Sequence, residues 1–207
     1  MKNRLLTLIL ISAFALHFAV AEAAQTKTLK LTEKNIDKIV AAMTLEEKAN
    51  IVVGMSRSLT DAETANIGYT KKIVPGAAGT TYPIPRLGVT PMVFADGPAG
   101  VRISTTRKGV DRKFYCTGFP VGTLLSSTWN DALVETVGNA LGEEAKEYGV
   151  DVLLAPGLNI MRNPLCGRNF EYYSEDPLLT GKIAAAYVRG VQSEGVGTSI
   201  KHYAVNN

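Results

Sequence analysis

The chain has 207 residues and a formal net charge of +3, and 46% of its residues are hydrophobic. This length is enough for one compact domain with a core of its own. The near-neutral charge, without a clustered basic run, argues against a nucleic-acid-binding protein.

The first 23 residues have the layout of a secretory signal peptide. Lys2 and Arg4 give a positive start, and an apolar run covers residues 5–20. Small residues then stand at the spacing of a cleavage site: Ala19, Ala21 and Ala23. The alternative, a transmembrane anchor, is less favoured because the run lies near the lower length limit for crossing a bilayer. We therefore expect an exported protein, secreted or periplasmic, with residues 1–23 removed and no stable membrane insertion after cleavage.

The remaining residues, 24–207, are expected to form one domain that begins with helices. Apolar residues recur at helical spacing between Ile36 and Met43. Thr44 and Glu47 then stand at the positions of a capping box, which predicts a second short helix. Residues 56–81 are rich in Gly, Thr and Ala without a sustained period, which predicts a loop.

From residue 91 onward, short apolar strands alternate with helices. Strands are predicted at residues 91–95, 151–155 and 197–200, with a helix at 130–148 between the first two. One face of this helix is predicted to carry Leu133, Val137, Leu141 and Tyr148.

The next helix is predicted to begin after Asp176, its N-cap, with Pro177 at the first helical position. Its buried face is predicted to hold Ile183, Ala184, Tyr187, Val188 and Val191.

Apolar strands separated by helices predict a parallel α/β sheet covered on both faces. A doubly wound sheet and a (β/α)₈ barrel both fit this order. No G-x-G-x-x-G or G-x-x-x-x-G-K-[ST] stands at a strand–helix junction, which argues against nucleotide binding. The chain is too short for a complete barrel of about 250 residues.

Charged residues follow the predicted strands. Asp96 ends the first strand within a Gly/Pro turn, and Arg102 follows; a carboxylate there could accept hydrogen bonds from sugar hydroxyls, or it could simply stabilise the turn. Lys201 and His202 follow the last strand, where a ligand contact competes with a purely structural histidine.

The loop after the second strand, residues 159–177, mixes charges with aromatic rings. Guanidinium groups can bind carboxylates or sugar hydroxyls, and rings offer flat faces to a pyranose. An internal salt-bridge network is the alternative, and we expect both uses within the loop. The residues concerned are Arg162, Arg168, Phe170, Glu171, Tyr172, Tyr173, Glu175 and Asp176.

Two other chemistries have little support. One histidine and two distant cysteines after the leader give no metal-ligand spacing, and no cofactor is expected. Cys116 and Cys166 lack a disulfide framework spacing and are expected to be free thiols. The sequence also contains no G-x-S-x-G elbow, which disfavours a Ser/His/Asp hydrolase.

Four segments together resemble glycoside hydrolase family 3, and within it the β-glucosidase-like enzymes. They are FADGPAGVR, FPVGTLLSSTWN, PLCGRNFEYYSEDP and IKHYAVNN, in this order. The resemblance covers roughly residues 30–207. It implies an α/β fold of the TIM type, a (β/α)₈ barrel that is incomplete here, with its N-terminal part only. It also implies hydrolysis of terminal β-linked sugars with retention of configuration.

Carried over to this sequence, the resemblance implies five residues that bind the sugar in the −1 subsite: Asp96, Arg102, Arg168, Lys201 and His202. It also implies a cis peptide bond between the last two. Retaining hydrolysis needs two carboxylates about 5 Å apart. The resemblance places the nucleophilic Asp and the acid/base Glu downstream of Asn207. We therefore expect these 207 residues to bind a sugar without cleaving it.

One branch of the family, acting on N-acetylglucosamine, carries K-H-F-P-G-H-G. This chain has KHYAVNN instead, without the second histidine, which favours the glucosidase or xylosidase side. The expected partner is an oligosaccharide or β-glycoside, not a nucleic acid. A non-catalytic carbohydrate-binding barrel is the alternative, and an unrelated phosphate- or metal-binding barrel is disfavoured by the missing motifs.

Overall fold

The computed structural model describes residues 29–55, 73–203 and 206. The predicted signal peptide and most of the predicted 56–81 loop lie outside the described residues. The chain divides into two compact units, Met1–Thr44 with Ile84–Thr90, and Leu45–Pro83 with Pro91–Asn207. All five predicted sugar-binding residues belong to the second unit.

The first unit holds helix α2 (Ile36–Ala42) and the 3₁₀ turn η1 (Pro85–Leu87). Ile39 is the buried apolar residue of α2. The Leu31 amide donates to the Leu87 carbonyl over 2.8 Å. The helix predicted from the spacing of Ile36 to Met43 is confirmed.

The second unit contains a four-stranded sheet with the order β1-β2-β3-β4. Its strands are β1 (Gly79–Thr80), β2 (Val93–Asp96), β3 (Val152–Leu154) and β4 (Gly197–Thr198). β2, β3 and β4 pair in parallel, as predicted, whereas β1 pairs antiparallel with β2. The loop prediction was wrong at β1, because a two-residue Gly-Thr strand has no period of its own and exists only through its pairing.

Helices connect the parallel strands. Helix α3 (Leu45–Val53) precedes the sheet, and α4 (Gly122–Ser126) and α5 (Asp131–Glu147) lie between β2 and β3. The turn η2 (Asn169–Glu171) and helix α6 (Pro177–Ser193) lie between β3 and β4. As predicted, Asp176 caps α6: its Oδ1 accepts from the Leu178 amide over 2.7 Å, and Pro177 takes the first helical position.

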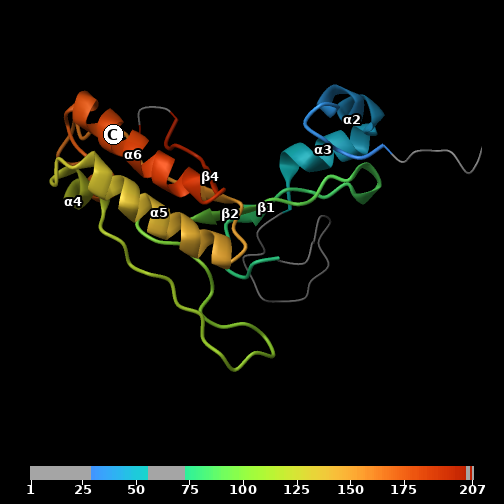
Figure 1. Ribbon diagram of the computed structural model, residues 1–207, viewed down its shortest axis with the longest axis horizontal. Helices are drawn as coiled ribbons and strands as arrows, with labels where there is room; N and C mark the ends of the chain where they lie inside the picture. Colours follow the sequence, from blue (N-terminus) through green and yellow to red (C-terminus); the bar gives the residue numbers. More distant parts are fainter. Residues whose placement is uncertain (1–28, 56–72, 204–205, 207) are drawn as a thin grey trace, which may run out of the picture. The chain divides into compact units, whose positions relative to one another are not determined.

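Helices α5 and α6 lie side by side, and their contact corrects the predicted face of α5 (Figure 1). Leu133 is 46% exposed, whereas its neighbour Val134 is fully buried. The buried face of α5 includes Gly138 and Gly142, where the two backbones approach closely. Leu141 is buried and Val137 and Tyr148 pack against the core, so the predicted face was wrong at Leu133 only. Hydrophobic periodicity does not detect the glycine contacts.

The core of this unit joins the inner faces of α5 and α6 to the parallel strands. Its fully buried members include Leu141, Leu153, Tyr187 and Val191. Among the described residues, no helix has both the length and the apolar character that crossing a bilayer requires. Cys116 and Cys166 are free thiols, as expected, and burial raises the pKa of Cys116 to about 11.

Candidate functional site

The candidate site lies where the parallel strands end. Asp96 is the last residue of β2, and the chain then turns sharply through residues 97–100. Gly97 has φ +143°, and a Cβ there would lie 1.8 Å from the Gly100 carbonyl oxygen, so this turn requires glycine. The turn closes when the Arg102 amide donates to the Asp96 carbonyl over 2.8 Å. It thereby brings the Arg102 side chain back to the end of β2.

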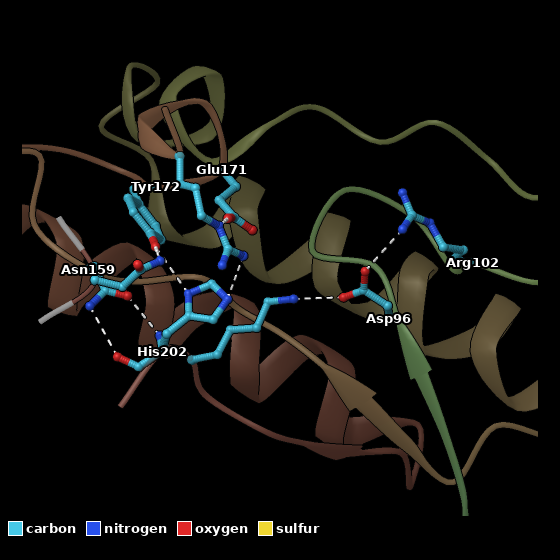
Figure 2. A network of polar contacts seen from close by, with 9 residues as sticks. Asp96, Arg102, Asn159, Glu171, Tyr172 and His202 are labelled. Carbon is cyan, nitrogen blue, oxygen red and sulfur yellow. Dashed lines mark hydrogen bonds and ion pairs between the residues drawn. The ribbon is translucent and has the colours of Figure 1, made fainter. Parts of the chain in front are cut away.

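Asp96 is held by two cations (Figure 2). Lys201 Nζ donates to Asp96 Oδ1 over 2.7 Å, and Arg102 Nη1 lies 3.5 Å from Oδ2. Burial alone would raise the pKa of Asp96, but the hydrogen bond and charge of Lys201, with the charge of Arg102, outweigh it. The pKa therefore lies below its ordinary value, and Asp96 is a carboxylate that accepts hydrogen bonds at neutral pH.

Arg168 enters the site from the loop between β3 and α6. It stands at the N-cap of η2, and its Nε donates to Glu171 three residues later. Its Nη2 lies 2.6 Å from His202 Nε2. Two acceptors from different parts of the chain therefore hold one guanidinium group.

Lys201 and His202 follow β4, and the peptide bond between them is cis, as the resemblance implied. The Lys201 amide donates to the Pro156 carbonyl over 3.0 Å, and the Leu158 amide donates to the Lys201 carbonyl over 2.9 Å. These bonds continue the pairing of β3 with β4 beyond the strands. Lys201 is thereby fixed beside the end of β3, with its ammonium group directed to Asp96.

A cavity of about 390 Å³ lies among these groups. Its lining includes Asp96, Arg102, Arg168, Phe170, Glu171 and Lys201. Four of the five predicted sugar-binding residues thus line one cavity. The fifth, His202, does not line it but contacts Arg168 at its wall.

The aromatic residues of the loop divide between two roles. Phe170 is 66% exposed and lines the cavity, so its ring can offer an apolar face to a ligand. Tyr172 and Tyr173 are buried, and Asp176 serves as the helix cap. This division is consistent with the expectation that the loop combines structural residues with residues that can contact a ligand.

Two contacts of His202 were not predicted from the sequence, one with Asn159 and one with Tyr172. Asn159 Oδ1 accepts from the His202 amide over 2.7 Å, and its Nδ2 donates to the His202 carbonyl over 3.1 Å. Tyr172 Oη lies 3.1 Å from His202 Nδ1. No local spacing could have revealed these contacts, because the partners are 43 and 30 residues apart.

The chemistry available here is the donation and acceptance of hydrogen bonds within one cavity. The two carboxylates that line the cavity, Asp96 and Glu171, are each ion-paired with a cation of the same cavity. Together these groups offer both acceptors and donors to hydroxyl groups. Within the described part of the chain, no group of three or more His, Cys, Asp or Glu could hold a metal ion.

Comparison with known proteins matches this arrangement to one family. The model of the glycosyl hydrolase family 3 N terminal domain matches residues 98–206. Thermostable beta-glucosidase B of Acetivibrio thermocellus is 42% identical over 176 residues, 84% of this chain and 20% of the relative. An exo-alpha-(1->6)-L-arabinopyranosidase of Bifidobacterium longum is 41% identical over 172 residues, 81% of this chain and 20% of the relative.

Among solved structures, beta-glucosidase 3B from Thermotoga neapolitana in complex with alpha-D-glucose matches with a TM-score of 0.75. It is 53% identical, and the match covers 84% of this chain and 24% of that one. The chain therefore spans about a fifth to a quarter of the length of these relatives. The fold is of the TIM-barrel type that the family resemblance implied, and the described residues form part of it. The chain belongs to glycosyl hydrolase family 3, in the N-terminal domain of that family.

Proposed function

We propose that this chain supplies the sugar-binding side of the −1 subsite in a retaining exo-β-glycosidase of the β-glucosidase or β-xylosidase type. The observation that carries the proposal is the convergence of Asp96, Arg102, Arg168 and Lys201 around one cavity at the carboxyl ends of parallel strands. Barrel enzymes have their active sites at this end of the sheet. The cavity volume, about 390 Å³, lies within the range of small-molecule sites.

In this proposal Asp96 accepts hydrogen bonds from two sugar hydroxyls, while Lys201, Arg102 and Arg168 donate to hydroxyl oxygens. His202 does not line the cavity, and in this proposal it takes part through Arg168, whose Nη2 lies 2.6 Å from His202 Nε2. The names of the relatives support a pyranoside as the substrate, and they include glucosidases and an arabinopyranosidase.

The ion pairs of Asp96 and Glu171 also support the proposal that this chain binds the sugar while residues outside it carry out the reaction. Each is neutralised by a cation of the cavity. In contrast, a nucleophile must form a bond to the substrate, and an acid/base must transfer a proton to or from it. We propose that both reacting carboxylates come from other parts of the full-length protein, and that this chain binds a sugar without hydrolysing it.

Sugar binding is tested by titrating the chain with methyl β-D-glucopyranoside and following it by NMR or calorimetry. Asp96→Asn should weaken binding about 100-fold or more, since a hydrogen bond to a charged group contributes about 1.5–3 kcal/mol and two are lost or weakened. Asp111→Asn is the matched control, because Asp111 is exposed and does not line the cavity. Equal affinity of the Asp96→Asn variant and the wild type would contradict the proposal.

Hydrolysis is tested with aryl β-glucoside, aryl β-xyloside and aryl α-L-arabinopyranoside. We expect turnover by the full-length gene product and none by these 207 residues. Turnover by the short chain would contradict the proposal that the reacting carboxylates lie outside it. Binding without turnover by the full-length product would favour a non-catalytic carbohydrate-binding protein.

Export is the remaining part of the proposal. The three-part layout of residues 1–23 supports a secreted or periplasmic location for the mature protein. Expression of the complete gene and mass spectrometry of the exported product should give an N-terminus close to Ala24. Retention of Met1 in the recovered protein would contradict this part.

A further inference from the structure

The backbone of His202 is held from both sides by one side chain, that of Asn159 (Figure 2). Asn159 Oδ1 accepts from the His202 amide over 2.7 Å, and Nδ2 donates to the carbonyl of the same residue over 3.1 Å. The orientation of the Asn159 amide is unambiguous, because a backbone N–H can only donate and a carbonyl can only accept. This side chain therefore fixes the position of the residue that carries the imidazole.

The two ring nitrogens of His202 face partners that decide where its proton lies. Arg168 Nη2, 2.6 Å from Nε2, can only donate, so Nε2 must present a lone pair. A neutral imidazole has one acceptor nitrogen, so Nδ1 carries the proton and donates to Tyr172 Oη over 3.1 Å. Burial raises the pKa of Tyr172, so its hydroxyl stays protonated while it accepts this bond and another from Asn206 Nδ2 over 2.7 Å.

The consequence reaches the cavity through Arg168. Its guanidinium group has Glu171 as the acceptor at Nε and His202 as the acceptor at Nη2. Two acceptors at two nitrogens fix the plane of a rigid guanidinium fork, which a single acceptor would leave free to turn. Loss of the lone pair on His202 Nε2 would remove one of these two acceptors.

We infer that Asn159 and Tyr172 are positioning residues that hold His202 as the neutral Nδ1–H tautomer, so that Nε2 orients the Arg168 guanidinium toward the cavity. Neither residue lines the cavity. They act on a sugar only through His202 and Arg168. The effect on sugar affinity rests on the proposed function, but the tautomer of His202 can be measured without any sugar.

The tautomer is accessible by ¹⁵N NMR because the sequence contains two histidines only, His17 and His202. In a His17→Gln background at about pH 7.5, above the ordinary histidine pKa of about 6.5, the ring should show a protonated Nδ1 and an unprotonated Nε2. Tyr172→Phe removes the acceptor of Nδ1–H and keeps the buried ring. It should shift the population toward the Nε2–H form.

Asn159→Ala should produce mixed tautomers, because the ring is no longer held opposite Tyr172. If this variant fails to fold, Asn159→Asp provides the second readout, since a carboxylate keeps the acceptor and loses the donor. Matched controls are Tyr173→Phe, at the adjacent buried tyrosine, and Asn163→Ala, at an exposed asparagine of the same loop. Both controls should leave the wild-type spectrum.

The inference would be overturned by a wild-type ring protonated at Nε2, or by variants of Tyr172 and Asn159 with an unchanged spectrum. In the sugar titration, both variants should weaken binding about threefold to tenfold, the effect of one displaced hydrogen bond. An unchanged affinity in both would also overturn it. Failure of the wild-type chain to bind sugar would instead contradict the proposed function, and the ¹⁵N spectra would still decide the positioning role.

Discussion

The contact between α5 and α6 and the cavity at the strand ends are held together in opposite ways. At the helix contact, the backbones approach because side chains are absent: a Cβ on Gly190 would lie 2.1 Å from the Glu135 carbonyl oxygen, and one on Gly138 would lie 2.5 Å from that of Tyr187. At the cavity, charged side chains extend from separate segments and meet at their ends, as Lys201 and Asp96 do. The helix contact depends mainly on steric fit, with one ion pair across it between Arg189 Nε and Glu135 Oε2 over 2.9 Å, whereas the cavity depends on charge. Each should therefore respond to a different kind of change.

The largest effect is expected where the helix contact is filled. Gly190→Ala places a methyl group against backbone atoms of α5, which cannot yield as a flexible side chain would. It should lower the free energy of unfolding by about 3 kcal/mol, at the upper end of the usual overpacking cost. Urea unfolding followed by circular dichroism measures this loss.

Gly181→Ala is the matched control in the same helix, since a Cβ there would meet no atom within 4 Å. Alanine is the better helix former, so this variant should gain about 0.5–1 kcal/mol. A comparable loss in both variants would mean that a general effect of substitution in α6, not the close approach of α5, governs Gly190.

A smaller effect is expected at Asp176, where the two regions adjoin. It ends the loop that carries Arg168 and begins α6, with its Oδ1 accepting from the Leu178 and Leu179 amides over 2.7 and 3.3 Å. Asp176→Ala should lower the free energy of unfolding by about 1 kcal/mol, the usual cost of losing an N-cap. Asp176→Asn should stay close to the wild type, because asparagine caps equally well. Equal losses in both would show that the negative charge matters more than the cap.

The sequence predicted much of both regions, but only where the signal is local. Asp96 and Lys201 could be placed together because the carboxyl ends of parallel strands in one sheet share one edge, and Asp176 followed from its position before Pro177. On the predicted face of α5 only Leu133 was misplaced, and the glycines that permit close approach were missed because they carry no hydrophobic signal. β1 was missed because its pairing with β2, not its composition, makes it a strand.

The candidate site shows the same limit. Residue type, strand-end position and the family resemblance pointed to four of the residues that line the cavity, whereas the contacts of Asn159 and Tyr172 with His202 depend on how distant segments meet. An asparagine in a polar loop and a tyrosine between other aromatic residues have many possible roles. Only the folded arrangement selects one of them.

The smallest effect is expected in the dependence of stability on pH, and it should separate the two regions. The folded pKa of Asp96 lies below its ordinary value of 3.8, because Lys201 and Arg102 outweigh the effect of burial. The unfolded chain therefore binds the proton more tightly. The stability contributed by this carboxylate is full above pH 3.8 and is lost as the pH falls through the lower folded pKa. Because the side chain is 35% exposed, we expect no more than about 1 kcal/mol.

Urea unfolding at a series of pH values between about 5 and 2.5 measures this loss, since it spans the ordinary pKa of an aspartate. The free energy of unfolding of Asp96→Asn should decline less steeply than that of the wild type across this range, whereas that of Asp111→Asn should follow the wild type.

Among the described residues of the helix contact, Tyr187 is the one titrating group with a strongly shifted pKa. Burial raises this pKa well above 10.0. Its contribution is lost on the alkaline side, as the pH rises through that raised pKa. Acid should therefore remove the contribution of the Asp96 ion pairs, whereas Tyr187 keeps its proton throughout this range. Equal slopes for Asp96→Asn and the wild type would mean that the ion pairs of the cavity do not contribute to stability.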